Sequence, residues 1–117
     1  MLIKVLDDTK ISLFALQKLR KLKAENAISR LPDILSKDDN FDVRREASEF
    51  LAEQGPFESA QQVFSAYQKN LINDDGLKVC IKFYKSRFTT DSLLTEADKI
   101  EDDNIQKKIA GFIKEQR

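Results

Sequence analysis

The chain has 117 residues, and 20 Lys and Arg balance 20 Asp and Glu, so its formal net charge at pH 7 is zero. This length is enough for one domain with a buried core, and the even balance argues against a nucleic-acid partner. Histidine is absent, which excludes Ser-His-Asp triads, Cys-His dyads and imidazole metal sites. Because the chain also lacks a Gly-x-x-x-x-Gly-Lys loop, we expect neither an enzyme nor a bound cofactor.

The sequence predicts a cytoplasmic protein. The single cysteine, Cys80, has no second cysteine in the chain to pair with, and this suits a reducing compartment. No apolar run approaches the roughly 18 residues of a membrane span. The start, MLIKVLDD, lacks the apolar stretch and cleavage site of a signal peptide. We therefore expect no membrane contact.

Apolar residues recur at three and four positions along almost the whole chain, which is the helical period. With only 3 Gly and 2 Pro, there is little room for the turns of a β-rich fold. A half-length helix is expected at residues 1–6, followed by seven longer ones. These longer helices are expected at 10–23, 24–36, 43–54, 58–72, 76–88, 91–100 and 104–114.

Every second predicted helix begins with a similar apolar residue. These residues are Ile11, Val43, Leu77 and Ile105, at separations of 32, 34 and 28. A regular spacing of this size indicates repeated helix pairs. Each of the four helices also follows acidic residues, which suit a helix N-terminus. The predicted N-caps are Thr9, Asp42, Asp75 and either Asp103 or Asn104, with Thr90 or Asp91 for the helix at 91–100. We prefer capping to Ca²⁺ or Mg²⁺ binding for these acids, because their spacing matches no EF-hand loop.

The best-defined pair spans residues 31–55. Gly55 followed by Pro56 is expected to end the second helix, because glycine tolerates the left-handed cap. This stretch resembles a HEAT repeat through Leu31, Pro32, Asp38, Val43, Arg44, Ala47, Leu51 and Gly55. Proline normally breaks a helix interior, but the resemblance implies that Pro32 kinks the first helix. The resemblance implies a right-handed α-solenoid of about four two-helix units, with a truncated first unit, that forms one domain over residues 1–117. It also implies a non-enzymatic scaffold that binds another protein or a peptide.

In such a solenoid the second helices line the concave surface, and helical geometry selects the side chains that point away from the paired helix. From these positions we predict a partner-binding ridge. Its residues are Leu13, Arg20, Arg45, Glu49, Val79, Phe83 and Lys107. The apolar members would anchor a partner and the cations would steer it. The competing interpretation is that strong curvature or a different helix rotation buries them. Ala52 falls in the same outward set.

Other residues receive structural interpretations. Phe50, Tyr84 and Phe112 are expected to stack between units. The resemblance implies an ion pair between Asp38 and Arg44, and Cys80 is expected to be an unreactive thiol.

The helix at 10–23 is apolar almost all round, and such a helix is either buried on several sides or available to a partner. We therefore predict self-association or docking at the N-terminal end, around Leu2, Val5, Phe14 and Leu16.

Two alternatives remain open. The chain is also similar to HEAT-like subunits of phycobilin lyases, although the absence of histidine weakens that reading. It is similar as well to DNA-gripping solenoids of the alkylation-repair glycosylase kind, which the zero charge and the absence of tryptophan weaken further.

Overall fold

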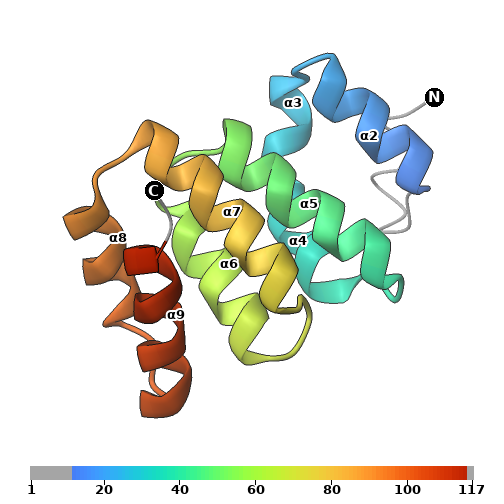
Figure 1. Ribbon diagram of the computed structural model, residues 1–117. Helices are drawn as coiled ribbons and strands as arrows, with labels where there is room; N and C mark the ends of the chain where they lie inside the picture. Colours follow the sequence, from blue (N-terminus) through green and yellow to red (C-terminus); the bar gives the residue numbers. More distant parts are fainter. Residues whose placement is uncertain (1–11, 116–117) are drawn as a thin grey trace.

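The computed structural model describes residues 12–115, and all regular secondary structure in this range is helical (Figure 1). The helices are α2 (Leu13–Lys21), α3 (Glu25–Ile28), α4 (Leu31–Lys37), α5 (Phe41–Gln54), α6 (Ser59–Gln68), α7 (Asp74–Arg87), α8 (Thr90–Ala97) and α9 (Asp103–Glu115). The predicted all-α class is thus confirmed for these residues. The helix expected at 1–6 and the cap expected at Thr9 lie outside them.

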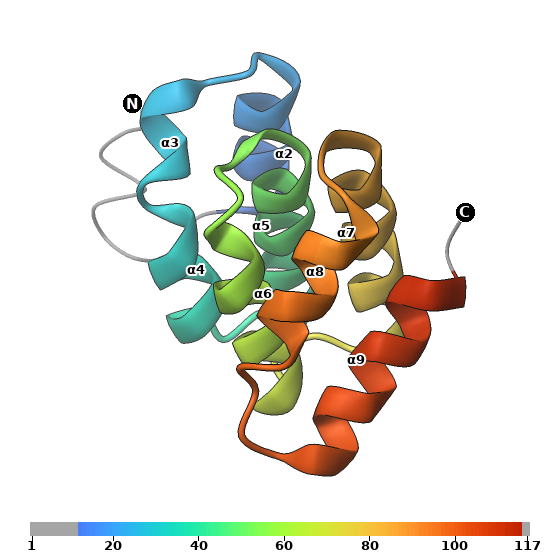
Figure 2. The same ribbon diagram turned by 90° about the vertical axis from the view of Figure 1, so that its left-hand side faces the viewer.

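The helices pack in pairs and in two layers. Consecutive helices α4 and α5, α6 and α7, and α8 and α9 pack against each other. In one layer α5 lies between α2 and α7, and α9 follows α7; in the other, α6 lies between α4 and α8. Figures 1 and 2 show α2, α5 and α7 side by side, with α4 and α6 on one face of them. From α4 onward, the helices thus contact one another as three consecutive pairs.

The N-cap residues predicted for α5, α7, α8 and α9 are wrong. The helices are capped instead by polar side chains one or two residues earlier in the chain. Each capping side chain accepts hydrogen bonds from backbone N–H groups of the first turn. These caps are Ser12 for α2, Asn40 for α5, Asn73 for α7, Thr89 for α8 and Asp102 for α9. Asp42, Asp75, Asp91 and Asp103 lie inside the first turns instead. A short side chain just before the helix reaches these free N–H groups best, whereas an acid one or two residues later meets the positive end of the dipole.

The single kinked helix predicted at 24–36 is instead two helices, α3 and α4. The α-helix is interrupted by a turn at Ser29 and Arg30, although both keep right-handed backbone angles, and Pro32 falls in the first turn of α4. Proline has no N–H to donate, and the first turn is where that donor is not needed. Pro32 therefore starts a helix here and kinks none.

Two helices end in the same way. Lys23 after α2 and Asn70 after α6 have positive φ, 54° and 64°. In each case the next residue's N–H reaches back five residues, from Ala24 to Leu19 and from Leu71 to Ala66. This is the Schellman arrangement. The left-handed cap predicted at Gly55 is wrong, because its φ is −81°. Glycine is needed there because a Cβ would lie 2.7 Å from the Leu51 carbonyl oxygen.

The core lies between the two layers and includes side chains from both. Phe50 and Tyr84 are fully buried, as their predicted stacking role requires, and Phe112 is half-buried with its ring edge-on to Tyr67.

In the part of the chain that the structure describes, no helix is both long enough and apolar enough to cross a bilayer.

Candidate partner-binding site

The predicted ridge is centred on Arg20, which reaches from α2 onto α5. Its guanidinium donates hydrogen bonds to Glu46 at 2.8 Å, to Glu49 at 3.2 Å and to Glu53 at 3.0 Å. Only 17% of the Arg20 side chain is exposed, against 13% for Glu46 and 16% for Glu49. One cation therefore holds three carboxylates, spaced at three- and four-residue intervals along one face of α5.

Arg20 also contacts α7. Its guanidinium carbon lies 5.3 Å from the centre of the Phe83 ring, which is within range of a cation–π interaction. Because α5 lies between α2 and α7 in this layer, the Arg20 side chain spans the polar face of α5. Side chains of α2 and α7 therefore meet across α5 at this point of the predicted ridge.

Arg45 extends the same network along α5. Its Nε donates to Glu49 at 2.9 Å, and 38% of its side chain is exposed. Three carboxylates against two guanidinium groups leave this cluster with one excess negative charge. Arg45 is the more exposed of its two cations and the one more available to a partner.

The pKa values of this cluster follow from its contacts. Burial by itself would lower the pKa of Arg20, but hydrogen bonds and charge from Glu46 and Glu53 raise it above its ordinary value. Burial would likewise raise the pKa of Glu53, but the hydrogen bonds from Arg20 and Gln54 and the charge of Lys23 hold it below its usual value. These directions favour the charged forms of Arg20 and Glu53.

The apolar members of the predicted ridge are half-buried. Leu13 and Phe83 pack against the core, and Val79 lies one turn before Phe83 on α7. Ala52, predicted to point outward, is fully buried. The physical reason is that α5 packs against α2, α4, α6 and α7, which leaves little of its surface in water. Lys107 is exposed on α9, and no contact joins it to the cluster around Arg20.

A set of contacts that the sequence analysis missed ties neighbouring helices together at their C-terminal ends. Long side chains donate to free carbonyl groups at the end of the adjacent helix. These bonds run from Gln54 to the Arg20 carbonyl, from Arg87 to those of Ala52 and Gly55, and from Lys85 to that of Ile113. Cations suit the negative end of a helix dipole. The basic residues late in α7 were the available signal, but their targets lie about thirty residues away.

The predicted ion pair between Asp38 and Arg44 does not form through the carboxylate. Arg44 donates to the backbone carbonyl of Asp38 at 2.9 Å and to that of Leu71 at 2.8 Å. The Asp38 carboxylate accepts the N–H of Asn40 instead. Arg44 thus joins the turn between α4 and α5 to the turn between α6 and α7 through their backbones.

Cys80 is fully buried, and its Sγ lies 3.4 Å from the Ser48 hydroxyl. Burial raises the pKa of the thiol to about 12. A thiol at neutral pH in such a site is a poor nucleophile. The interpretation of Cys80 as unreactive is therefore supported by its surroundings.

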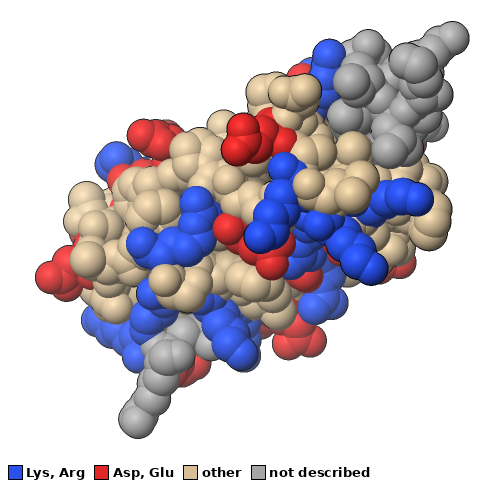
Figure 3. Space-filling view, turned by 90° about the horizontal axis from the view of Figure 1, so that it is seen from above, with Lys and Arg blue, Asp and Glu red and all other residues tan. Residues whose placement is uncertain are grey.

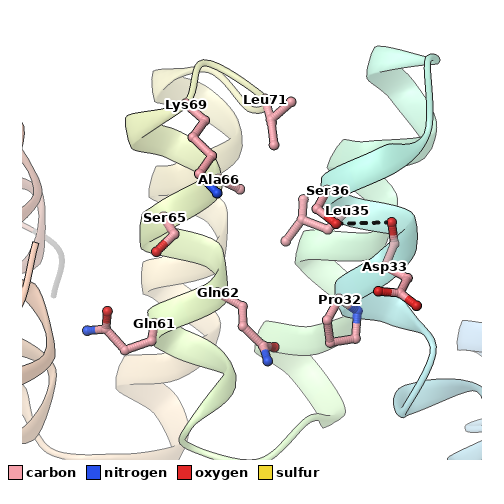
Figure 4. A pocket seen from close by; sticks show the side chains of 10 residues that line it. All are labelled: Pro32, Asp33, Leu35, Ser36, Gln61, Gln62, Ser65, Ala66, Lys69 and Leu71. Carbon is pink, nitrogen blue, oxygen red and sulfur yellow. Dashed lines mark hydrogen bonds between the residues drawn. The ribbon is translucent and has the colours of Figure 1, made fainter.

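A groove lies between the outer helices α4 and α6. Residues of α4 and α6 and of the turn after α6 line a space of about 280 Å³ (Figure 4). Pro32 and Leu35 lie on one wall, with Gln61, Gln62 and Ser65 opposite. The lining lacks a cluster of charged or nucleophilic side chains. Among residues 12–115, no group of three or more His, Cys, Asp or Glu is placed to hold a metal ion.

Charge on the face seen from above is mixed. Figure 3 shows Lys and Arg side chains gathered across this face, with Asp and Glu among them. No protein family, curated protein or solved structure matches this chain.

Proposed function

We propose that this chain is a HEAT-like α-solenoid that acts as a non-enzymatic scaffold for another protein. The solenoid reading rests on two features. Successive helix pairs pack in the same order in both layers. The contacts between neighbours also recur, since Gln54 joins α5 to the end of α2 and Arg87 joins α7 to the end of α5. Repeated units that bury their apolar faces against like neighbours are the basis of solenoid stability.

The binding surface that we propose is the face shared by α5 and α7. The observation that carries it is the half-buried pair Val79 and Phe83 beside the partly exposed Arg45–Glu49 pair. Aromatic and arginine side chains with a polar rim are the usual anchors of a protein interface. Arg20 supports this surface through its contact with the Phe83 ring. It does not attract the partner by its charge, since three carboxylates already neutralise it.

We also propose a cytoplasmic location. The free, buried thiol of Cys80 suits a reducing compartment.

The test is affinity capture from a lysate of the source organism. The bait is the full chain as wild type and as Arg45→Glu and Phe83→Ala. The matched control is Gln62→Glu, which changes charge on the exposed face of α6. We expect a captured protein that binds the wild type and Gln62→Glu equally and is depleted at least about tenfold with either ridge variant. A captured protein that all four baits retain equally contradicts the ridge as the binding surface.

A further inference from the structure

The outward face of α2, extended by its C-cap residue Leu22, carries the two most exposed large apolar side chains of the described chain. Phe14 is 72% exposed and Leu22 is 65% exposed. They are eight residues apart, so they lie on neighbouring parts of one helical face, separated by about 12 Å along its axis. Exposed apolar surface that is bordered by polar residues is a candidate interaction site.

The charge between these two side chains is positive. Lys18 and Lys21 lie on the same face and are exposed, and together with Phe14 and Gln17 they line one hollow. The chain contains no Asp or Glu from residue 12 to residue 24. The carboxylates of Glu46, Glu49 and Glu53 on α5 are paired with Arg20. No acidic side chain of residues 12–115 forms an ion pair with Lys18 or Lys21.

This face is distinct from the ridge. Phe14 and Lys21 lie about 100° around the helix from Leu13 and Arg20. Ala15, Leu16 and Leu19 form the buried side. The predicted contact surface at the N-terminal end is therefore wrong for Leu16, which is fully buried. Its predicted members Leu2 and Val5 lie outside the described residues.

We propose that this α2 face binds an acidic amphipathic helix of a different protein. The partner helix would place apolar side chains seven or eight residues apart against Phe14 and Leu22. Its Asp or Glu residues between them would meet Lys18 and Lys21. Helix-on-helix binding of this kind combines buried apolar anchors with charge complementarity that selects the partner.

A second copy of this chain fits the face poorly. Two α2 faces brought together about a two-fold axis would set Lys18 and Lys21 against their own copies, which is repulsive. Elsewhere on the described chain, no other large apolar side chain is exposed to complement Phe14 and Leu22. The chemistry of the face therefore favours a partner with different residues.

The test uses a fluorescent synthetic peptide of about 18 residues, long enough to form a helix. It carries two Leu seven residues apart with Glu between them, and the control peptide has the same composition in shuffled order. Anisotropy with the full-length protein at low salt is expected to show binding of the ordered peptide at least about tenfold tighter than of the shuffled one. Phe14→Ser, at a site too exposed to disturb folding, is expected to weaken binding about tenfold, as is Leu22→Ser.

Charge exchange provides the specificity control. The double variant Lys18→Glu/Lys21→Glu is expected to lose the acidic peptide and to bind a peptide with Lys in place of Glu, and both effects shrink at high salt. Gln62→Glu serves as the unchanged control.

The proposal is overturned if the ordered and shuffled peptides bind alike. It is also overturned if sedimentation shows a wild-type dimer that Phe14→Ser disperses, since the occupant is then a second copy. Binding to phosphatidylserine vesicles without peptide binding overturns it in favour of a membrane surface. None of these outcomes bears on the ridge variants Arg45→Glu and Phe83→Ala.

Discussion

Replacing Arg20 by methionine tests whether the cluster on α5 depends on a single cation. Methionine keeps a flexible apolar stem but removes the hydrogen bonds to Glu46, Glu49 and Glu53 and the contact with Phe83. Three neighbouring carboxylates then face one another without their shared partner. The loss of one member of a buried ion pair costs about 3–5 kcal/mol.

The cost must be reduced for solvent screening, because the side chains keep 13–38% of their exposure. We therefore expect the free energy of unfolding at pH 7 to fall by about 2–3 kcal/mol. With a urea m-value of about 1.5 kcal/mol/M, the midpoint moves down by about 1.5 M. The assay is urea denaturation followed by circular dichroism.

The pH dependence gives a second readout. The folded-state pKa of Glu53 is lowered below the ordinary value of a glutamate. The stability that Glu53 contributes is therefore present above that ordinary pKa and is lost as the pH falls through the folded-state pKa. Arg20→Met removes this contribution. The difference between wild type and variant should therefore narrow as the pH is lowered from neutral into the acid range.

The matched control is Lys37→Met, which removes the exposed pair with Asp33 and should change stability by less than about 0.5 kcal/mol. A cost below about 1 kcal/mol for Arg20→Met, or a cost that is the same at neutral and acid pH, would refute the assignment of Arg20 as the organising cation.

Three further outcomes are expected. Asn73→Ala, which removes the cap of α7, should cost about 1 kcal/mol in urea denaturation, whereas Asp75→Ala should cost less than half of that; the reverse order would restore the acidic-cap interpretation. The Cys80 thiol, whose pKa burial raises to about 12, should react with a chromogenic disulfide reagent at pH 8 only as fast as the protein unfolds, and rapid labelling of the native state would contradict this. Duplex DNA at low salt should bind weakly in a gel-shift assay, because the guanidinium groups of Arg44 and Arg87 already donate to backbone carbonyls; tight binding would favour the DNA-gripping alternative.

Much of the fold could be predicted from local patterns. The three- and four-residue recurrence placed α5, α7 and α9 within a few residues of their bounds. Two local predictions failed, the kink at Pro32 and the acidic N-caps, and each failure has a physical reason. Pro32 was expected to kink a helix because the HEAT resemblance implies it, although a proline that begins a helix leaves the same local pattern. Acidic residues were read as caps because the dipole favours them throughout the first turn, whereas the capping oxygen belongs to the residue before it.

The candidate site was predicted less well. Arg45, Glu49 and Phe83 do lie together with Arg20, but nothing in the sequence indicated that three carboxylates already pair with Arg20. Whether a cation is free or neutralised depends on the residues opposite it, and those of Arg20 lie 26 to 33 positions along the chain. Lys107, chosen by the same helical geometry, is not joined to them.

The sequence by itself determined that this chain folds as successive amphipathic helices, because helix formation responds to a period of about four residues that is written locally. The tertiary structure decided which polar side chains on those helices remain free. A rotation of about 100°, the angle between consecutive residues, is enough to exchange a buried side chain for an exposed one. That rotation is fixed only when α2, α5 and α7 pack together, which is why Arg20 became a support within the layer while Phe14, Lys18, Lys21 and Leu22 were left facing water.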